Sequence, residues 1–156
     1  MKKILLVVLA LLVIAQFIQP KRNLGTALGD ADITHSVQVP DTIMRLLQVS
    51  CFDCHSNNTS YPWYSRITPV NWWIKDHVDE GRSGLNFSTF DQYSYKRKDH
   101  KLEEIIETVN EHAMPLDSYL WIHKEAKLDE KQRKAIVDWA KLAREQVMRD
   151  SLSAKP

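Results

Sequence analysis

Apolar side chains recur every three or four residues along most of this chain, which is the spacing of amphipathic helices and not of strands. Ile43, Leu46 and Leu47 share one helical face in the segment that opens at Pro40 and Asp41 and runs into Cys51. Three later stripes follow the same spacing: Trp72, Trp73, Ile74 and Val78; Leu102, Ile105, Ile106 and Val109; Ile136, Trp139, Ala140, Ala143 and Val147. The pattern therefore predicts an all-α domain.

Capping residues predict where the second of these helices begins and ends. Thr68 and Pro69 are an N-cap and first-turn pair, and Gly81 is expected to stop the helix. A loop with its own cap is predicted at residues 86–88, before a short turn that ends near Tyr95.

The two remaining helices are predicted from the third and fourth stripes. The third stripe predicts a helix over about residues 99–112. Asp129 and Gln132 have the spacing of a capping box, so the last helix is expected to begin there.

The first residues differ from the rest because they are apolar all round. Met1-Lys2-Lys3 precedes a nearly uninterrupted apolar run from Ile4 to Ile18, the pattern of a bacterial export signal. As a helix, this run of 15 residues spans about 22 Å, less than the roughly 30 Å hydrocarbon core of a bilayer. A cleaved signal and a retained membrane anchor both remain open, and we expect an anchor, with the domain on the periplasmic side of a bacterial inner membrane.

The expected layout is a signal or anchor over residues 1–20, a linker over 21–39, a single domain over 40–150 and a tail over 151–156. Without residues 1–20, which hold two lysines and no acid, 19 basic residues (21 − 2) face 20 acidic ones. This near-neutral balance argues against nucleic-acid binding.

The most specific motif is C-x-x-C-H, formed by Cys51, Cys54 and His55. This spacing is the attachment signature of a c-type haem, in which two thiols form thioethers and the histidine becomes the proximal iron ligand. Cys51 and Cys54 are the only cysteines, so the motif predicts one covalent haem. A thioredoxin-like redox pair and a zinc site are the alternatives, but the first expects strands and the second expects a further ligand pair.

A sixth iron ligand is predicted at Met114, which lies 59 residues after His55 (114 − 55). A methionine thioether opposite a histidine raises the potential of a cytochrome c. Pro115 ends the preceding helix and disfavours helical geometry at Met114, so the side chain is expected to project from a loop. An ordinary core methionine is the alternative.

Histidines compete for the same position, because a second histidine also binds haem iron and lowers the potential. His112, His77 and His123 lie on or beside predicted helices, while His35 and His100 have polar surroundings.

Aromatic residues are dense after the motif, and their rings are expected to cover an apolar haem face or to form an ordinary core. They are Tyr61, Trp63, Tyr64, Trp72 and Trp73.

Several stretches together resemble the bacterial haem-binding domain family. They are C-F-D-C-H-S-N-N-T-S-Y-P-W-Y-S-R-I-T-P-V-N-W-W from Cys51, H-V-D-E-G-R from His77, L-N-F-S from Leu85 and M-P-L-D-S-Y-L from Met114. The resemblance covers about residues 35–145. It implies one haem in a small, cytochrome c-like helical domain, here preceded by a hydrophobic N-terminal helix, and it leaves the reaction open.

Two functions fit these expectations. The first is a carrier that passes single electrons between periplasmic redox partner proteins, with His55 and Met114 as iron ligands. The second is a peroxidase-like enzyme or a redox or gas sensor with an open or exchangeable sixth position.

Overall fold

The computed structural model describes residues 1–154, and within them every regular element is helical. The predicted all-α class is therefore confirmed. In chain order the elements are α1 (Lys2–Ala15), η1 (Ile33–His35), α2 (Asp41–Ser50), α3 (Phe52–His55), η2 (Trp63–Arg66), α4 (Val70–Gly84), η3 (Phe87–Gln92), α5 (Tyr95–Asn110), α6 (Asp117–Leu120), η4 (Lys124–Ala126) and α7 (Glu130–Ser153).

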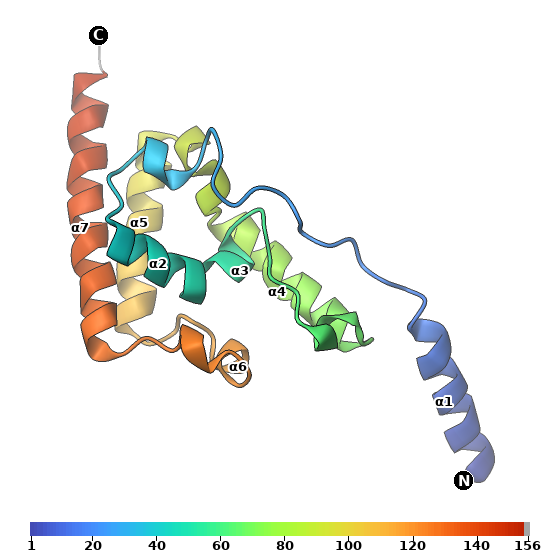
Figure 1. The fold of residues 1–156 in the computed structure, drawn as a ribbon. Coiled ribbons are helices and arrows are strands. Elements are labelled where there is room, and N and C mark those ends of the chain that lie inside the picture. The colour runs from blue at the N-terminus through green and yellow to red at the C-terminus, as the bar shows by residue number, and fades with distance from the viewer. Residues whose placement is uncertain (155–156) are drawn as a thin grey trace.

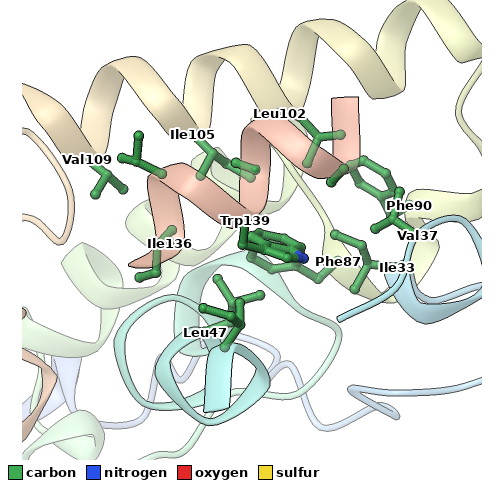
Figure 2. Packing of buried hydrophobic residues seen from close by; sticks show 14 of the residues in the cluster. Ile33, Val37, Leu47, Phe87, Phe90, Leu102, Ile105, Val109, Ile136 and Trp139 are labelled. Carbon is green, nitrogen blue, oxygen red and sulfur yellow. The ribbon is translucent and has the colours of Figure 1, made fainter. Parts of the chain in front are cut away.

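The frame of the domain is the pair α5 and α7, which lie side by side, with α2 crossing in front of them (Figure 1). Figure 2 shows the core between these helices, where Leu47 of α2 meets Trp139 of α7 beneath Ile105 of α5. Leu47 is 1 % exposed and Trp139 is 5 % exposed.

Side-chain caps set the first residue of both α7 and α5. Asp129 and Gln132 form the predicted capping box at the start of α7. The helix expected over 99–112 begins earlier, at Tyr95, because the Ser94 side chain accepts the amide of Arg97 and caps the helix there. α4 also differs: its N-cap is Pro69, and it continues past Gly81 to Gly84.

The segment expected as a linker is packed against the domain. Ile33 and Val37, 0 % and 2 % exposed, lie in the core beside Phe90 (Figure 2). Residues 23–25 pair with residues 57–59, where the amide of Gly25 donates to Asn57 (2.7 Å) and the amide of Thr59 donates to Asn23 (3.0 Å). We call residues 16–39 the strap.

Both ends of the described chain are helical. α7 continues into the expected tail as far as Ser153, and residues 155–156 lie outside the described residues. α1 has no buried side chain. Within residues 1–154, no helix is both long enough and apolar enough to cross a membrane.

Candidate functional site

A cavity of about 560 Å³ opens between the C-x-x-C-H motif, the end of α4, and the loop that follows α5. This volume lies in the range of small-molecule and cofactor sites. Cys51, Cys54, His55 and Met114 all line it. Residues predicted from two separate motifs are therefore brought to one cavity, whose other walls include Leu47, Leu85, Phe87, Ile105, Val109 and Ile136.

The motif reaches the cavity through a break between two short helices. α2 ends when the amide of Cys51 donates to Leu47, and α3 restarts at once, with the amides of Cys54 and His55 both donating to the Cys51 carbonyl. One helical turn therefore presents two thiols and an imidazole to the same space.

The imidazole of His55 is fixed by two backbone carbonyls. Its Nδ1 lies 3.0 Å from the oxygen of Gly81 and 3.0 Å from that of Leu85. Carbonyl oxygens only accept, so Nδ1 carries a proton, and in the neutral ring Nε2 keeps its lone pair. Burial lowers the pKa of His55, although the two carbonyl bonds act in the opposite direction. A neutral ring with an oriented free nitrogen is the form that ligates a metal.

Gly81 allows this arrangement because α4 passes directly over the motif. A Cβ at position 81 would lie 2.6 Å from the Cys54 oxygen and 3.0 Å from the Cys54 Cβ. The sequence predicted a helix stop here; the glycine instead permits close packing while its carbonyl accepts from His55. We call Cys51, Cys54, His55 and Gly81 the motif wall.

Met114 lies in the loop between α5 and α6, half-buried at the edge of the cavity. The carbonyl of Thr108, near the end of α5, accepts the amides of both Ala113 (2.9 Å) and Met114 (3.1 Å). These bonds turn the chain so that Met114, Pro115 and Leu116 line the cavity. We call these three residues and Tyr119 the loop wall.

Arg133 of α7 is hydrogen-bonded to the backbone of this loop, a role that the sequence analysis did not predict. Arg133 is only 7 % exposed, and its Nη1 donates to the carbonyls of Val109 and Met114, both at 3.1 Å. The available signal was a charged residue three positions before Ile136, on the apolar face of the last helix.

Tyr119 joins the two walls. Its hydroxyl donates to Oδ2 of Asp53, inside the C-x-x-C-H motif, at 2.8 Å. Asp53 Oδ1 accepts the amide of Ser60 (2.9 Å), so the carboxylate has a partner on each oxygen. Burial, followed by the charge of Asp53, raises the pKa of Tyr119.

The other histidines are spread over the molecule. His77 also lines the cavity, with Nδ1 3.0 Å from the Trp73 carbonyl. His123 Nε2 is 2.7 Å from the Tyr64 hydroxyl, and His112 lies 3.7 Å from a carboxylate of Glu130. His35 is bonded to Gly29, and His100 faces Glu103 and Glu104. Within residues 1–154, His77 is thus the one histidine besides His55 on this cavity.

The aromatic cluster expected to cover the site lies elsewhere. None of Tyr61, Trp63, Tyr64, Trp72 and Trp73 lines the main cavity. Tyr64 and Trp73 instead line a neighbouring cavity of about 80 Å³. The aromatic rings of the main cavity come from Phe87 and Tyr119, which are distant from the motif in sequence.

Residues 10–142 match the family model described as haem-binding domain. The chain belongs to the haem-binding domain family. The matched range begins inside α1 and includes the strap, in agreement with the packing of that segment. No curated protein and no solved structure matches the chain.

The residues present fit the haem that this family binds. The cavity has mainly apolar walls, and it combines two thiols at C-x-x-C-H spacing, an imidazole with its second nitrogen already bonded, and a thioether. These groups are of the kinds that hold a haem in proteins.

The two other interpretations of the cysteines fit less well. Burial raises the pKa of Cys51 to about 12, and burial with the nearby Asp53 charge raises that of Cys54 to about 11, whereas thioredoxin-like thiols have lowered pKa values. The strands of a thioredoxin-like fold are absent from residues 1–154. Nor do those residues gather three or more His, Cys, Asp or Glu side chains that could hold a metal ion such as zinc.

Proposed function

We propose that this haem-binding domain is an exported electron carrier with one covalent c-type haem. Cys51 and Cys54 would form the thioethers, His55 Nε2 would bind the iron, and the Met114 sulfur would take the sixth position. The observation that carries the proposal is the common cavity, in which an oriented imidazole and a thioether meet two thiols.

A haem bound here supplies reversible one-electron chemistry at its iron. His55 holds its ring through the carbonyls of Gly81 and Leu85, so Nε2 keeps one direction in both oxidation states. The apolar side chains of the cavity exclude water, which disfavours the more highly charged iron. A Met114 thioether favours the reduced iron as well. Both effects support a carrier of comparatively high potential.

The place of action in the proposal is the outer face of a bacterial inner membrane. Lys2 and Lys3 followed by an apolar helix support export, and covalent attachment of c-type haem takes place after export. Redox partner proteins in the periplasm would then give and take the electron.

One observation favours a second function. His77 lines the cavity, and Met114 is only half-buried, so a displaced thioether would leave an iron position near an imidazole. A peroxidase-like enzyme or a gas sensor would use such a position, with His77 as acid and base.

Covalent attachment is tested by producing the full chain in a bacterium that matures c-type cytochromes. The intact mass should exceed that of the polypeptide by one haem, and the pigment should stay with the protein in acidified acetone. Replacing both Cys51 and Cys54 by serine should abolish this attachment. A colourless wild-type protein with two free thiols would contradict the proposal.

The sixth ligand is tested with Met114→Leu, which nearly conserves side-chain volume. We expect loss of the far-red sulfur-to-iron band, a lower potential and faster binding of carbon monoxide. Met44→Leu is the matched control, because Met44 packs against the core and does not line the cavity. Wild-type protein that binds carbon monoxide at once and turns over peroxide, with turnover lost in His77→Gln, would replace the carrier by the second function.

A further inference from the structure

Five large apolar side chains that serve neither the core nor the haem cavity lie at the surface. Trp63 is 78 % exposed, Trp72 40 %, Trp73 46 %, Trp121 71 % and Ile122 61 %. We call these five residues the aromatic patch. Four of the five tryptophans of the chain belong to it, while the fifth, Trp139, is buried.

Contacts connect the patch across three elements. The rings of Trp63 and Tyr64 in η2 are 5.9 Å apart, and the Tyr64 hydroxyl bonds to His123, the residue that follows Ile122. Trp73 and Ile122 line the same 80 Å³ cavity. η2, the start of α4 and the end of α6 thus form one surface.

The C-terminal end of α1 is bonded to this surface. Gln16 and Thr68 form a reciprocal pair, in which Gln16 Nε2 donates to the Thr68 carbonyl and the Thr68 amide donates to Gln16 Oε1, both at 3.0 Å. Trp72 Nε1 donates to the Ile18 carbonyl at 3.1 Å. Gln19 adds bonds to the Arg66 carbonyl and the Asn71 side chain. No free tether separates α1 from the domain.

The charge around the junction is positive. Residues 61–75 contain no acidic residue; of their two basic residues, Arg66 has no ion pair within residues 1–154, whereas Lys75 pairs with Asp79, and Lys21 and Arg22 follow the end of α1. Basic side chains next to tryptophans are typical of surfaces that bind the interface of anionic membranes.

We propose that the aromatic patch lies in the headgroup interface of an anionic bilayer, beside α1. With 14 residues, α1 is about 21 Å long, shorter than the roughly 30 Å hydrocarbon core. Residues 16–19 are hydrogen-bonded to residues 66–72, so the end of α1 cannot move away from the domain. A bilayer that buries the apolar side chains of α1, Phe17 and Ile18 must therefore also contact the patch. The inference goes beyond electron transfer and rests on the proposed place of action at the inner membrane, with α1 as the anchor expected from the sequence.

The opposite edge of the molecule provides an internal control. α1 leaves the domain on one side, while α7 forms the other edge (Figure 1). α7 also exposes apolar side chains, with Leu142 64 %, Met148 57 % and Leu152 68 % exposed, but these alternate with charged residues along the helix. Both edges therefore expose apolar side chains, but only the edge with the aromatic patch is bonded to the end of α1.

The test uses the full chain in nanodiscs of phosphatidylcholine and phosphatidylglycerol that include a phospholipid with a photoreactive headgroup. After irradiation, mass spectrometry should locate lipid adducts at residues 61–73 and 121–122, several-fold more often than at residues 142–152. Omitting phosphatidylglycerol should reduce the adducts on the patch more than those on α1. Trp63→Gln with Trp121→Gln should lower adducts over the whole patch, whereas Leu142→Gln should not.

Adducts confined to residues 1–20 would overturn the proposal, and so would the absence of adducts. Protein-to-protein cross-links through the patch, with a dimer in light scattering, would assign the patch to a second copy instead. Haem content is measured in the same samples. Trp63 and Trp121 do not line the haem cavity, so the haem content of the variants should equal that of the wild type. A failure of the haem proposal is therefore recognised separately.

Discussion

On the motif wall, backbone carbonyls alone orient the key side chain, whereas the loop wall also depends on side chains of other helices. His55 is fixed by two carbonyls at the end of α4, and Gly81 brings that helix into contact with Cys54. Met114 instead lies in a half-buried loop that depends on Arg133 and, through Tyr119, on Asp53. In the proposed haem site, the attachment and the proximal ligand would therefore be fixed, while the sixth position could adjust.

Gly81→Ala should have the largest effect on stability and haem incorporation, because it changes the packing of the motif wall. The new Cβ would meet the Cys54 carbonyl at 2.6 Å, so α4 must shift and His55 loses the geometry of its two acceptors. We expect unfolding free energy to fall by roughly 3 kcal/mol, the upper part of the usual range for overpacking, with reduced haem incorporation. Chemical denaturation and the ratio of haem to protein measure the two effects.

Gly84→Ala is the matched control for this variant. Gly84 lies in the same helix and lines the same cavity, but a Cβ there would meet nothing within 4 Å. Alanine should leave the packing of α4 on Cys54 unchanged and can add up to about 1 kcal/mol of helix stability. Equal behaviour of the two variants would mean that close packing at Gly81 is not what holds the motif wall.

Arg133→Met should weaken the loop wall and leave the motif wall intact. The change removes the shared donor of the Val109 and Met114 carbonyls, and unsatisfied buried acceptors cost about 1–3 kcal/mol, so we expect a loss of roughly 2 kcal/mol. Covalent haem should still form. The far-red band should weaken and carbon monoxide should bind faster, because Met114 is no longer positioned.

Two further variants separate positioning from stability. Arg133→Lys keeps one donor and should recover part of the band. Arg149→Met changes an exposed arginine of the same helix, whose carboxylate partner Glu145 is 3.9 Å away, and should change neither property. Loss of stability in Arg133→Met with an unchanged band would show that Arg133 supports the fold but not the ligand.

The same contrast explains which parts of the site could be predicted from the sequence. The C-x-x-C-H motif, the stripe of α5 and the capping box at Asp129 are local patterns, and the structure contains each at its predicted place. Pro115 predicted a loop at Met114, and the structure shows that loop on the cavity; ligation by Met114 stays a prediction.

Long-range contacts could not be predicted in this way. Gly81 was interpreted as a helix stop because its need for space comes from Cys54, on another helix. The segment before residue 40 was predicted as a linker. The sequence could not show its packing, because the hydrogen bonds that hold residues 23–25 come from residues 57–59. Sequence proximity left the aromatic run after the motif open between a haem cover and an ordinary core, whereas Phe87 and Tyr119 reach the cavity from distant segments.

Tyr119→Phe should give the smallest effect and shows how far the two walls are coupled. Phenylalanine keeps the ring, whose centroid lies 4.2 Å from that of the His123 ring, but removes the hydroxyl bonded to Asp53. Loss of one partly buried hydrogen bond predicts a decrease of about 1 kcal/mol in unfolding free energy, while Asp53 keeps the amide of Ser60. If the walls are coupled through this bond, carbon monoxide binding should also become faster, with haem content unchanged. Tyr95→Phe, at an exposed tyrosine far from the cavity lining, provides the control for the loss of a phenol. A Tyr119→Phe protein that loses stability but binds carbon monoxide at the wild-type rate would mean that Arg133 and the Thr108 carbonyl hold the loop wall on their own.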